Sequence, residues 1–328
     1  VISSLCNAGK SHGGVIKTVI ILYMFSTVLA AVIAVFASMA FPVKMTLANA
    51  ATDTSAPQGI VEVLNNLLLN VVANPVSSLV NANYVGILMW AVLLGLAFRV
   101  ADKMTKKVLA DVADGISMVV TWIINLAPFG IFGLVFNTVS TNGLDIFTTY
   151  GKLLLLLVGC MLFIYFVTNP LLVYWCIRQN PYPLIFHCLK RSALTAFFTR
   201  SSAANIPVNM KVCEEMGLDR DTYSVTIPLG ATINMDGAAI TITVMTMATA
   251  FTLGIHVDIP TAIILSLLAA LSACGASGVA GGSLLLIPMA CSLFGISDDI
   301  SMQVVAVGFI IGVVQDSVET ALNSSSDQ

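Results

Sequence analysis

The chain has 328 residues, of which 58% are hydrophobic and only 9% are charged, and its formal net charge is −3. A soluble domain carries roughly a quarter charged residues, so this composition excludes a water-soluble globular protein and predicts a chain surrounded largely by membrane lipid. The chain has no basic arm and no patch rich in Lys and Arg, which excludes nucleic acid as a partner.

Long uncharged stretches predict membrane-spanning helices, because one span needs about 20 apolar residues. In chain order, the predicted spans lie at 18–43, 64–98, 116–139, 153–177, 223–255, 259–297 and 300–314. The stretch 64–98 is interrupted at 74–75 and 81–83, which predicts a broken helix or two shorter ones. Polar or glycine-rich residues also interrupt 223–255 at 234–237 and 259–297 at 274–283.

The positions of Lys and Arg predict the orientation and two re-entrant hairpins. Basic residues gather at 10–17, 99–107, 178–191 and 211–220, and the positive-inside rule places these segments in the cytoplasm. Segment 192–210 lies between two such groups, so it must enter the membrane and return, with Ser201 and Ser202 near its tip. No Lys or Arg follows Arg220, which fits a second hairpin, 260–295, that enters from outside.

Acidic residues near the apolar spans are the strongest functional signal. Intramembrane carboxylates cost several kcal/mol unless they are paired or functional. Asp316, Thr320, Asn323 and Asp327 recur at i, i+4, i+7 and i+11, which predicts one polar stripe on a helix, with Glu319 on the same side. The alternative is a soluble C-terminal helix with a solvated face.

Other polar residues are less informative by themselves. Arg200 is the only basic residue inside a predicted hairpin, where it either pairs with Asp316 or Glu319 or only balances charge. Hydroxyl groups in the first span are usually helix-packing groups. The interruptions are places where unwound backbone carbonyls can replace the hydration shell of Na⁺.

Common catalytic and metal-binding patterns are absent from the sequence. The seven cysteines form no CxxC pair, and the three histidines show no ligand-like spacing. No GxSxG, HExxH or P-loop motif is present. The sequence therefore favours a transporter over an enzyme or an ATP-driven pump.

Two motifs carry a family resemblance that covers nearly the whole chain. Residues 198–207 read FTRSSAANIP and residues 228–238 read PLGATINMDGA, and the glycine-rich tip and the acidic stripe follow in the same order. These motifs resemble the dicarboxylate/amino acid:cation symporters, which are relatives of the glutamate transporters. Residues 198–210, 273–288 and 304–325 are most similar to the branch of bacterial serine/threonine:sodium symporters.

The resemblance implies an all-α membrane protein: a multi-span, elevator-type transporter with two re-entrant helical hairpins and interrupted helices. It implies a homotrimer in lipid, in the bacterial plasma (inner) membrane. Segment 46–142 would form the scaffold and trimerisation region, whereas 14–43 and 150–328 would form the mobile transport domain. The first two helices of the family are mostly missing, so we expect the chain to be a fragment of a longer protein.

The resemblance also implies roles for individual residues. Ser201, Ser202 and Asn323 would contact the substrate α-carboxylate, Asp316 would bind its α-ammonium group, and Val279 would close over it. The full substrate set is Ser201, Ser202, Val279, Asp316, Glu319, Thr320 and Asn323.

Na⁺ would be the co-transported ion, and the resemblance implies three sodium sites without an organic cofactor. The first site comprises carbonyls of Gly230, Asn234 and Asn323 with the Asp327 carboxylate. The second comprises carbonyls of Thr232, Ala273, Cys274 and Ala276. The third comprises Tyr23, Ser26, Thr27, Asn234 and Asp236.

Two departures from the acidic-substrate members bear on specificity. Those members have an arginine where this chain has Glu319, and a threonine where it has Ala238. A carboxylate at 319 would repel a substrate carboxylate or accept a hydrogen bond from a hydroxyl group. We therefore expect sodium-coupled import of serine, threonine or a similar small neutral amino acid.

Three alternatives stay open from the sequence. One is an acidic amino acid, dicarboxylate or proton-coupled carrier of the same fold. Another is an ion channel. The third is an intramembrane enzyme, for which no nucleophile with a histidine partner can be named.

Overall fold

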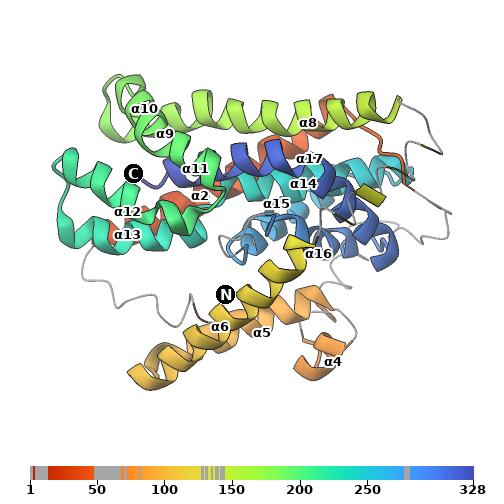
Figure 1. Cartoon of the computed structure of the whole chain (residues 1–328), viewed down its shortest axis with the longest axis horizontal. Helices are drawn as coiled ribbons and strands as arrows, with labels where there is room; N and C mark the ends of the chain where they lie inside the picture. The colour runs from red at the N-terminus through yellow and green to blue at the C-terminus, as the bar shows by residue number, and fades with distance from the viewer. Residues whose placement is uncertain are drawn as a thin grey trace.

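The computed structural model describes residues 3, 14–47, 68–69, 72–80, 83–126, 129, 132–133, 136, 140, 145–276 and 281–328. Across these ranges the chain is helical apart from turns and short connections, and they contain no β-strand. The elements in chain order (Figure 1) are α2 (Gly14–Ala40), α4 (Pro75–Val80), α5 (Tyr84–Ala97), η1 (Phe98–Val100), α6 (Lys103–Asn125), α8 (Asp145–Phe163), η2 (Ile164–Thr168), α9 (Asn169–Ile177), α10 (Tyr182–Cys188), η3 (Leu189–Ala193), α11 (Leu194–Thr199), α12 (Ser202–Glu215), α13 (Arg220–Ile233), α14 (Asp236–Thr252), α15 (Ile259–Ala273), η4 (Leu284–Leu286), α16 (Ile287–Ser292) and α17 (Asp298–Ser325).

Among the described residues, four helical stretches are long and apolar enough to cross a membrane, namely Lys17–Ala40, Thr148–Ile177, Arg220–Thr252 and Asp298–Ser325. Large apolar side chains on these stretches stay exposed, among them Phe36, Leu155 and Trp175. Such exposure is unfavourable in water and favourable in lipid. The structure thus confirms the prediction of an all-helical membrane protein.

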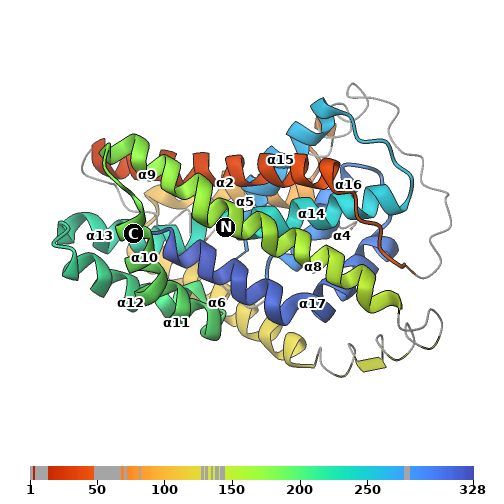
Figure 2. The ribbon, with the colours of Figure 1, turned by 90° about the horizontal axis from the view of Figure 1, so that it is seen from above.

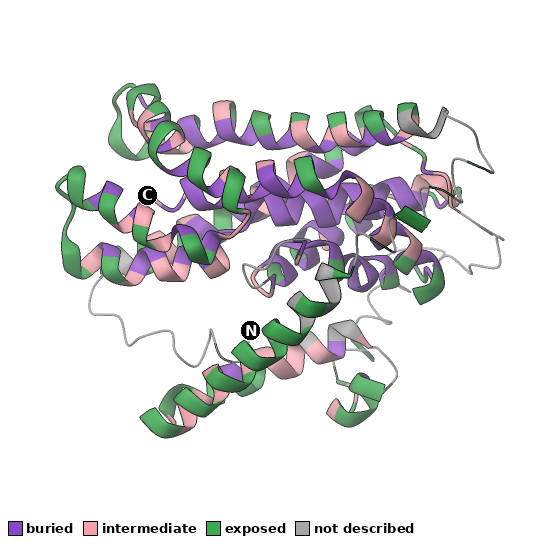
Figure 3. Cartoon of the chain, in the orientation of Figure 1, coloured by how far each residue is buried: buried purple, intermediate pink, exposed green. Residues whose placement is uncertain are grey.

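The core of the molecule surrounds α14. Every residue from Asp236 to Ala250 is buried, and α14 packs against α2, α8, α15, α16 and α17. Seen from above, α2, α8, α14 and α17 run along the long axis of the molecule (Figure 2). Buried residues concentrate in these central helices, whereas α4, α5 and α6 lie to one side of them and hold few buried residues (Figure 3).

The span predicted at 153–177 is one long rod with a local distortion. It consists of α8, the π-helical turn η2 and α9, and Pro170 is the second residue after the π turn. Proline has no N–H to donate to the carbonyl four residues earlier. That carbonyl, on Phe166, accepts a hydrogen bond from the Tyr182 hydroxyl at 3.3 Å instead.

Hairpin 1 comprises residues 182–215 and is longer than the predicted segment 192–210. Its first arm is α10, η3 and α11, and its second arm is α12. Its helices extend past both ends of the predicted segment, and the basic residues that set those ends, Lys190, Arg191 and Lys211, lie inside helices. Near its base, Arg191 and Glu215 form an ion pair at 3.5 Å across the two arms.

The tip of hairpin 1 reverses the chain within two residues. Arg200 ends α11 in the left-handed conformation, with φ of 51°. Ser201 is extended and caps α12, because its side chain accepts a hydrogen bond from the N–H of Ala204 at 3.2 Å. A left-handed residue other than glycine is unfavourable and often marks a functional site.

Hairpin 2 comprises α15, the tip and the returning η4 and α16, and these elements lie within residues 259–292, beside the predicted segment 260–295. Residues 277–280 at its tip lie outside the described residues. Between the hairpins, the chain breaks at Asn234 and Met235, which separate α13 from α14 as the sequence predicts. Asp219 begins α13 by accepting hydrogen bonds from the Thr222 hydroxyl and N–H, and these bonds lower the pKa of Asp219.

The remaining spans differ in detail from the prediction. In the described part of the interrupted stretch 64–98, α4 and α5 are separate short helices, which agrees with the predicted interruption. Helix α6 begins at Lys103 rather than at 116, because a charged segment can extend an apolar helix into the aqueous interface. Helix α17 continues past the apolar stretch 300–314 through the acidic residues to Ser325, so it is the helix on which the sequence predicts the polar stripe.

Close packing of α17 against hairpin 2 requires a glycine at 308. A Cβ atom at Gly308 would lie 2.6 Å from Cδ2 of the buried Leu284, whereas one at Gly312, one turn later, would lie 4.0 Å from its Cδ1. We expect Gly308→Ala to lower the free energy of unfolding by about 1–3 kcal/mol, because overpacking displaces η4. Gly312→Ala is the matched control and should change stability by less than about 1 kcal/mol. Thermal unfolding in detergent measures both variants, and equal midpoints would contradict the packing argument.

Candidate functional site

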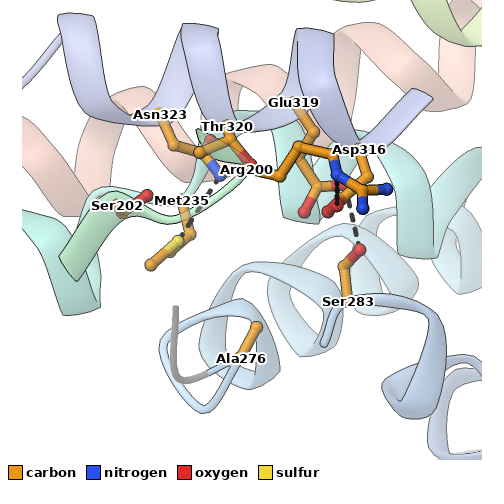
Figure 4. A pocket seen from close by; sticks show the side chains of 9 residues that line it. All are labelled: Arg200, Ser202, Met235, Ala276, Ser283, Asp316, Glu319, Thr320 and Asn323. Atoms are coloured by element: carbon orange, nitrogen blue, oxygen red, sulfur yellow. Dashed lines mark hydrogen bonds and ion pairs between the residues drawn. The ribbon is translucent and has the colours of Figure 1, made fainter. Parts of the chain in front are cut away.

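A pocket lies where the two hairpin tips, the α13–α14 break and α17 meet (Figure 4). It holds about 280 Å³ of empty space including its open mouth, which leaves room for a small solute at most. Its lining residues are Arg200, Ser202, Met235, Ala276, Ser283, Asp316, Glu319, Thr320 and Asn323.

The polar stripe of α17 faces the interior. Asp316, Glu319, Thr320 and Asn323 are each at most 6% exposed, so the alternative of a soluble helix with a solvated face is wrong. Asp327 is equally buried, but it lies beyond Ser326, the C-cap of α17. The predicted helical stripe therefore ends at Asn323, and Asp327 reaches the interior from the segment that follows the helix.

Asn323 is oriented by the first turn of α14. The N–H of Gly237, which has no partner within its own helix, donates to Oδ1 of Asn323 at 2.7 Å. This bond fixes the amide so that its nitrogen lies 3.5 Å from Sδ of Met235, which also lines the pocket. The amide group thus offers N–H donors to the pocket rather than an acceptor.

The N-terminus of α12 is a second source of donors. Ser202, the first residue of α12, is buried and lines the pocket. The first N–H groups of a helix lack helical partners and carry a partial positive charge. An anionic group is therefore favoured beside Ser201 and Ser202.

Arg200 pairs with Asp316 rather than Glu319. Its Nε lies 3.9 Å from Oδ2 of Asp316, and Oδ1 of Asp316 accepts a hydrogen bond from the N–H of Gly281 on hairpin 2 at 3.1 Å. Oδ2 is buried and has no hydrogen-bond partner in the part of the chain that the structure describes. This oxygen can accept a hydrogen bond from a donor group of a ligand.

Glu319 is held by donors that the sequence did not single out. Its Oε2 accepts hydrogen bonds from the hydroxyls of Thr241 at 2.7 Å and Ser283 at 2.9 Å, and from the amide of Gln315. Gln315 stands four residues before Glu319, a spacing that could have identified it. Thr241 and Ser283 lie in segments far from Glu319 in sequence, and no local pattern connects them.

Most residues of the predicted third sodium site meet at Asp236. Ser26 donates to its Oδ2 at 2.7 Å and Thr27 to its Oδ1 at 3.2 Å. Asn234 lies two residues away, and its Oδ1 is buried without a hydrogen-bond partner among the described residues. Tyr23 joins through its carbonyl, which accepts from the Thr27 hydroxyl at 2.9 Å.

The predicted first sodium site centres on Asp327. Its Oδ1 accepts a hydrogen bond from Nδ2 of Asn234 at 3.1 Å. Gly230 lies so close that a Cβ atom there would be 2.6 Å from this oxygen. The carbonyl of Asn323 is linked to the same cluster by Ser326, whose hydroxyl bonds to it at 3.0 Å and to Asn234 Nδ2 at 2.9 Å.

Asn209 on hairpin 1 reaches this Asp327 cluster and was missed by the sequence. Its Nδ2 lies 3.5 Å from Oδ2 of Asp327 and 2.7 Å from the carbonyl of Ser324. Asn205 and Ser192 extend the same network across the two arms of hairpin 1. Asparagines inside a hairpin carry no spacing signal that points to a residue more than 100 positions away.

The predicted second sodium site is brought together only in part. Sγ of Cys274 lies 3.6 Å from the carbonyl of Ile233, so hairpin 2 approaches the end of α13 beside Thr232. The carbonyl of Ala273 already accepts the N–H of Ala276 at 2.9 Å. Val279, predicted to close over the substrate, lies outside the described residues.

Comparison with known proteins places the chain in a family of transporters. A family model described as the sodium:dicarboxylate symporter family matches residues 1–328. The chain is also 63% identical over 311 residues to the serine/threonine transporter SstT of Bifidobacterium adolescentis, an alignment that covers 94% of this chain and 72% of the relative. The chain therefore belongs to the sodium:dicarboxylate symporter family. This membership confirms the resemblance and the prediction of a multi-pass membrane transporter rather than an enzyme.

Proposed function

We propose that this protein is a sodium-coupled symporter that imports serine, threonine or a similar small neutral amino acid. The observation that carries the proposal is the buried carboxylate of Glu319 in the pocket beside the Arg200–Asp316 pair. The name of the relative from Bifidobacterium adolescentis supports the same substrates.

The charges that line the pocket favour a zwitterion without a second carboxylate. Arg200 contributes one positive charge, whereas Asp316 and Glu319 contribute two negative charges. The α-ammonium group of an amino acid would donate to Oδ2 of Asp316, which accepts no hydrogen bond from the described residues and forms only the ion pair with Arg200. A substrate carboxylate about 4 Å from Glu319 would be repelled by about 4 kcal/mol at an effective dielectric constant of 20. Dicarboxylates and acidic amino acids are therefore disfavoured.

The donors on the opposite side of the pocket suit the substrate α-carboxylate. The N-terminus of α12 at Ser201 and Ser202 and the amide of Asn323 offer N–H and hydroxyl groups to an anion. In this orientation the substrate side chain points toward Glu319, which accepts a hydrogen bond from its hydroxyl group. Thr320 borders the same space, and Val279 is assigned to the tip that closes over the ligand.

Sodium ions would occupy the clusters at Asp236 and Asp327, with a third site at the tip of hairpin 2. Carboxylate, hydroxyl and carbonyl oxygens are the ligands that hard cations prefer. The third site, at Thr232, Ala273, Cys274 and Ala276, would form fully when hairpin 2 closes, since the carbonyl of Ala273 is engaged by Ala276. Sodium and substrate would then stabilise the same closed hairpin, and each would raise the affinity for the other by the same factor.

The arrangement of helices supports an elevator with a separate scaffold. We assign 46–142 to the scaffold and 14–43 with 150–328 to the transport domain, because α4 to α6 lie to one side of the remaining helices (Figure 1). Apolar side chains on α6, including Ile116 and Trp122, are exposed and would face lipid or other copies in a homotrimer. A bacterial inner membrane is the proposed location.

Binding of radiolabelled L-serine to the purified protein tests the proposed function directly. We expect binding in sodium medium that threonine displaces and aspartate does not, and no measurable binding in choline medium. Aspartate binding instead would favour an acidic amino acid symporter of the same fold. Equal serine binding in the two media would refute sodium coupling.

Replacing Glu319 tests its role in specificity. We expect Glu319→Arg to weaken serine binding by about 10- to 100-fold, the worth of a hydrogen bond to a charged group, and to admit aspartate. Glu319→Gln keeps the size of the side chain without its charge. It should therefore admit aspartate less readily than Glu319→Arg does. Competition against labelled serine measures both variants. If Glu319→Arg still excludes aspartate and still binds serine, the specificity argument fails.

A substitution at Gly230 tests whether the Asp327 cluster binds sodium. A Cβ atom at this position would lie 2.6 Å from Asp327 Oδ1 and 3.1 Å from Cζ of Tyr23, so it must displace the carboxylate. We expect Gly230→Ala to raise the sodium concentration for half-maximal serine binding by about tenfold, equivalent to about 1.4 kcal/mol. Gly159→Ala, where a Cβ atom meets open space, is the control. An unchanged sodium dependence would remove this cluster from the proposed ion sites.

A further inference from the structure

Three side-chain donors from three elements converge on one oxygen of Glu319. Thr241 extends from α14, Ser283 from hairpin 2 and Gln315 from the preceding turn of α17, and all three bond to Oε2. Figure 4 shows Ser283 below the carboxylate and the remainder of the pocket to its side. An ionised carboxylate oxygen has about two lone-pair sites, so three donors saturate Oε2.

The other oxygen of Glu319 is left to the pocket. Oε1 receives no hydrogen bond from the residues that the structure describes. It also does not belong to the fully buried polar atoms that lack a hydrogen-bond partner in these residues. Glu319 itself lines the cavity. Because Oε2 is already saturated, a ligand hydroxyl can bond only to Oε1.

The donors also restrain one another. The amide of Gln315 donates to the Thr241 hydroxyl at 2.7 Å as well as to Glu319, so it uses both of its hydrogens. Thr241 Oγ1 lies 3.0 Å from the carbonyl of Gly237, one turn earlier on α14. The carboxylate therefore cannot rotate about its last bond without breaking several bonds together.

We propose that Thr241, Ser283 and Gln315 are positioning residues that set the preference for a hydroxylated substrate side chain. They hold Glu319 so that Oε1 points at the hydroxyl of the bound amino acid, and the inference rests on the proposed amino acid symport. Ser283 belongs to hairpin 2, so the set is complete only when this hairpin lies against α17. Recognition of the hydroxyl and closure of the hairpin therefore depend on the same bond.

The test compares substrates that differ only in a hydroxyl group. Dissociation constants are measured in saturating sodium for serine against alanine and for threonine against L-2-aminobutyrate. We expect Thr241→Val and Ser283→Ala to weaken serine and threonine binding about threefold to tenfold, while alanine and 2-aminobutyrate change less than about twofold. The preference for the hydroxylated partner therefore falls in both pairs.

Matched variants separate positioning from damage to the fold. Ser283→Thr keeps a hydroxyl and should keep the preference. Thr243→Val makes the same exchange on α14 at a buried hydroxyl without a hydrogen-bond partner in the described residues, and it should leave both pairs unchanged.

Two results would overturn the inference. If serine and alanine weaken by the same factor in Thr241→Val and Ser283→Ala, the three residues only support the fold. If the unmodified protein binds serine with sodium but does not prefer it to alanine, the inference fails while the proposed function stands. Absence of sodium-dependent amino acid binding in the unmodified protein would instead refute the proposed function and, with it, this inference.

Discussion

The structure depends on one constraint, which is that carboxylates at membrane depth must find donors without bulk water. Asp236, Asp316, Glu319 and Asp327 are all buried. Each receives at least two hydrogen bonds or one hydrogen bond and an ion pair. Their donors come from α2, hairpin 1, hairpin 2, α14 and α17, so satisfying these four groups requires most of the helices to meet at one place. The charged groups thereby specify the arrangement of a core that apolar packing alone would leave less defined.

Interrupted helices supply what continuous ones cannot. An intact helix uses its own N–H and carbonyl groups, whereas the break at Asn234 and Met235 and the two hairpin tips release them. The N–H of Gly237 orients Asn323, and the N–H of Gly281 contacts Asp316. The breaks that look like defects in a spanning helix are therefore the parts that build the pocket.

The sequence predicts this architecture well where short stretches of neighbouring residues determine the structure. Apolar length identified the spans, and polar or glycine-rich interruptions identified the breaks at Asn234 and at hairpin 2. The helices of hairpin 1 extend past the predicted segment 192–210, because the positive-inside rule locates charges relative to the membrane and not the ends of helices. Helix α6 starts earlier than its apolar stretch for the same reason.

Contacts between distant segments could not be predicted from spacing. The family resemblance supplied Ser26 and Thr27, whose contacts to Asp236 no local pattern reveals. No local pattern identifies Thr241, Ser283 and Asn209, because the role of each depends on an acidic residue at least 36 positions away. The orientation of Asn323 likewise depends on a backbone N–H, which every residue except proline possesses.

One amide group connects the two acidic clusters. Nδ2 of Asn234 donates to Asp327 and Ser326, while its Oδ1 remains unpartnered in the described residues, two positions from Asp236. Turning this amide over would place its oxygen against the Asp327 carboxylate, so the bonds to Asp327 and Ser326 fix the direction of Oδ1. Under the proposed sodium coupling, an ion that holds Asn234 at one cluster would also hold its amide for the other, so the two proposed sites would fill as a cooperative pair.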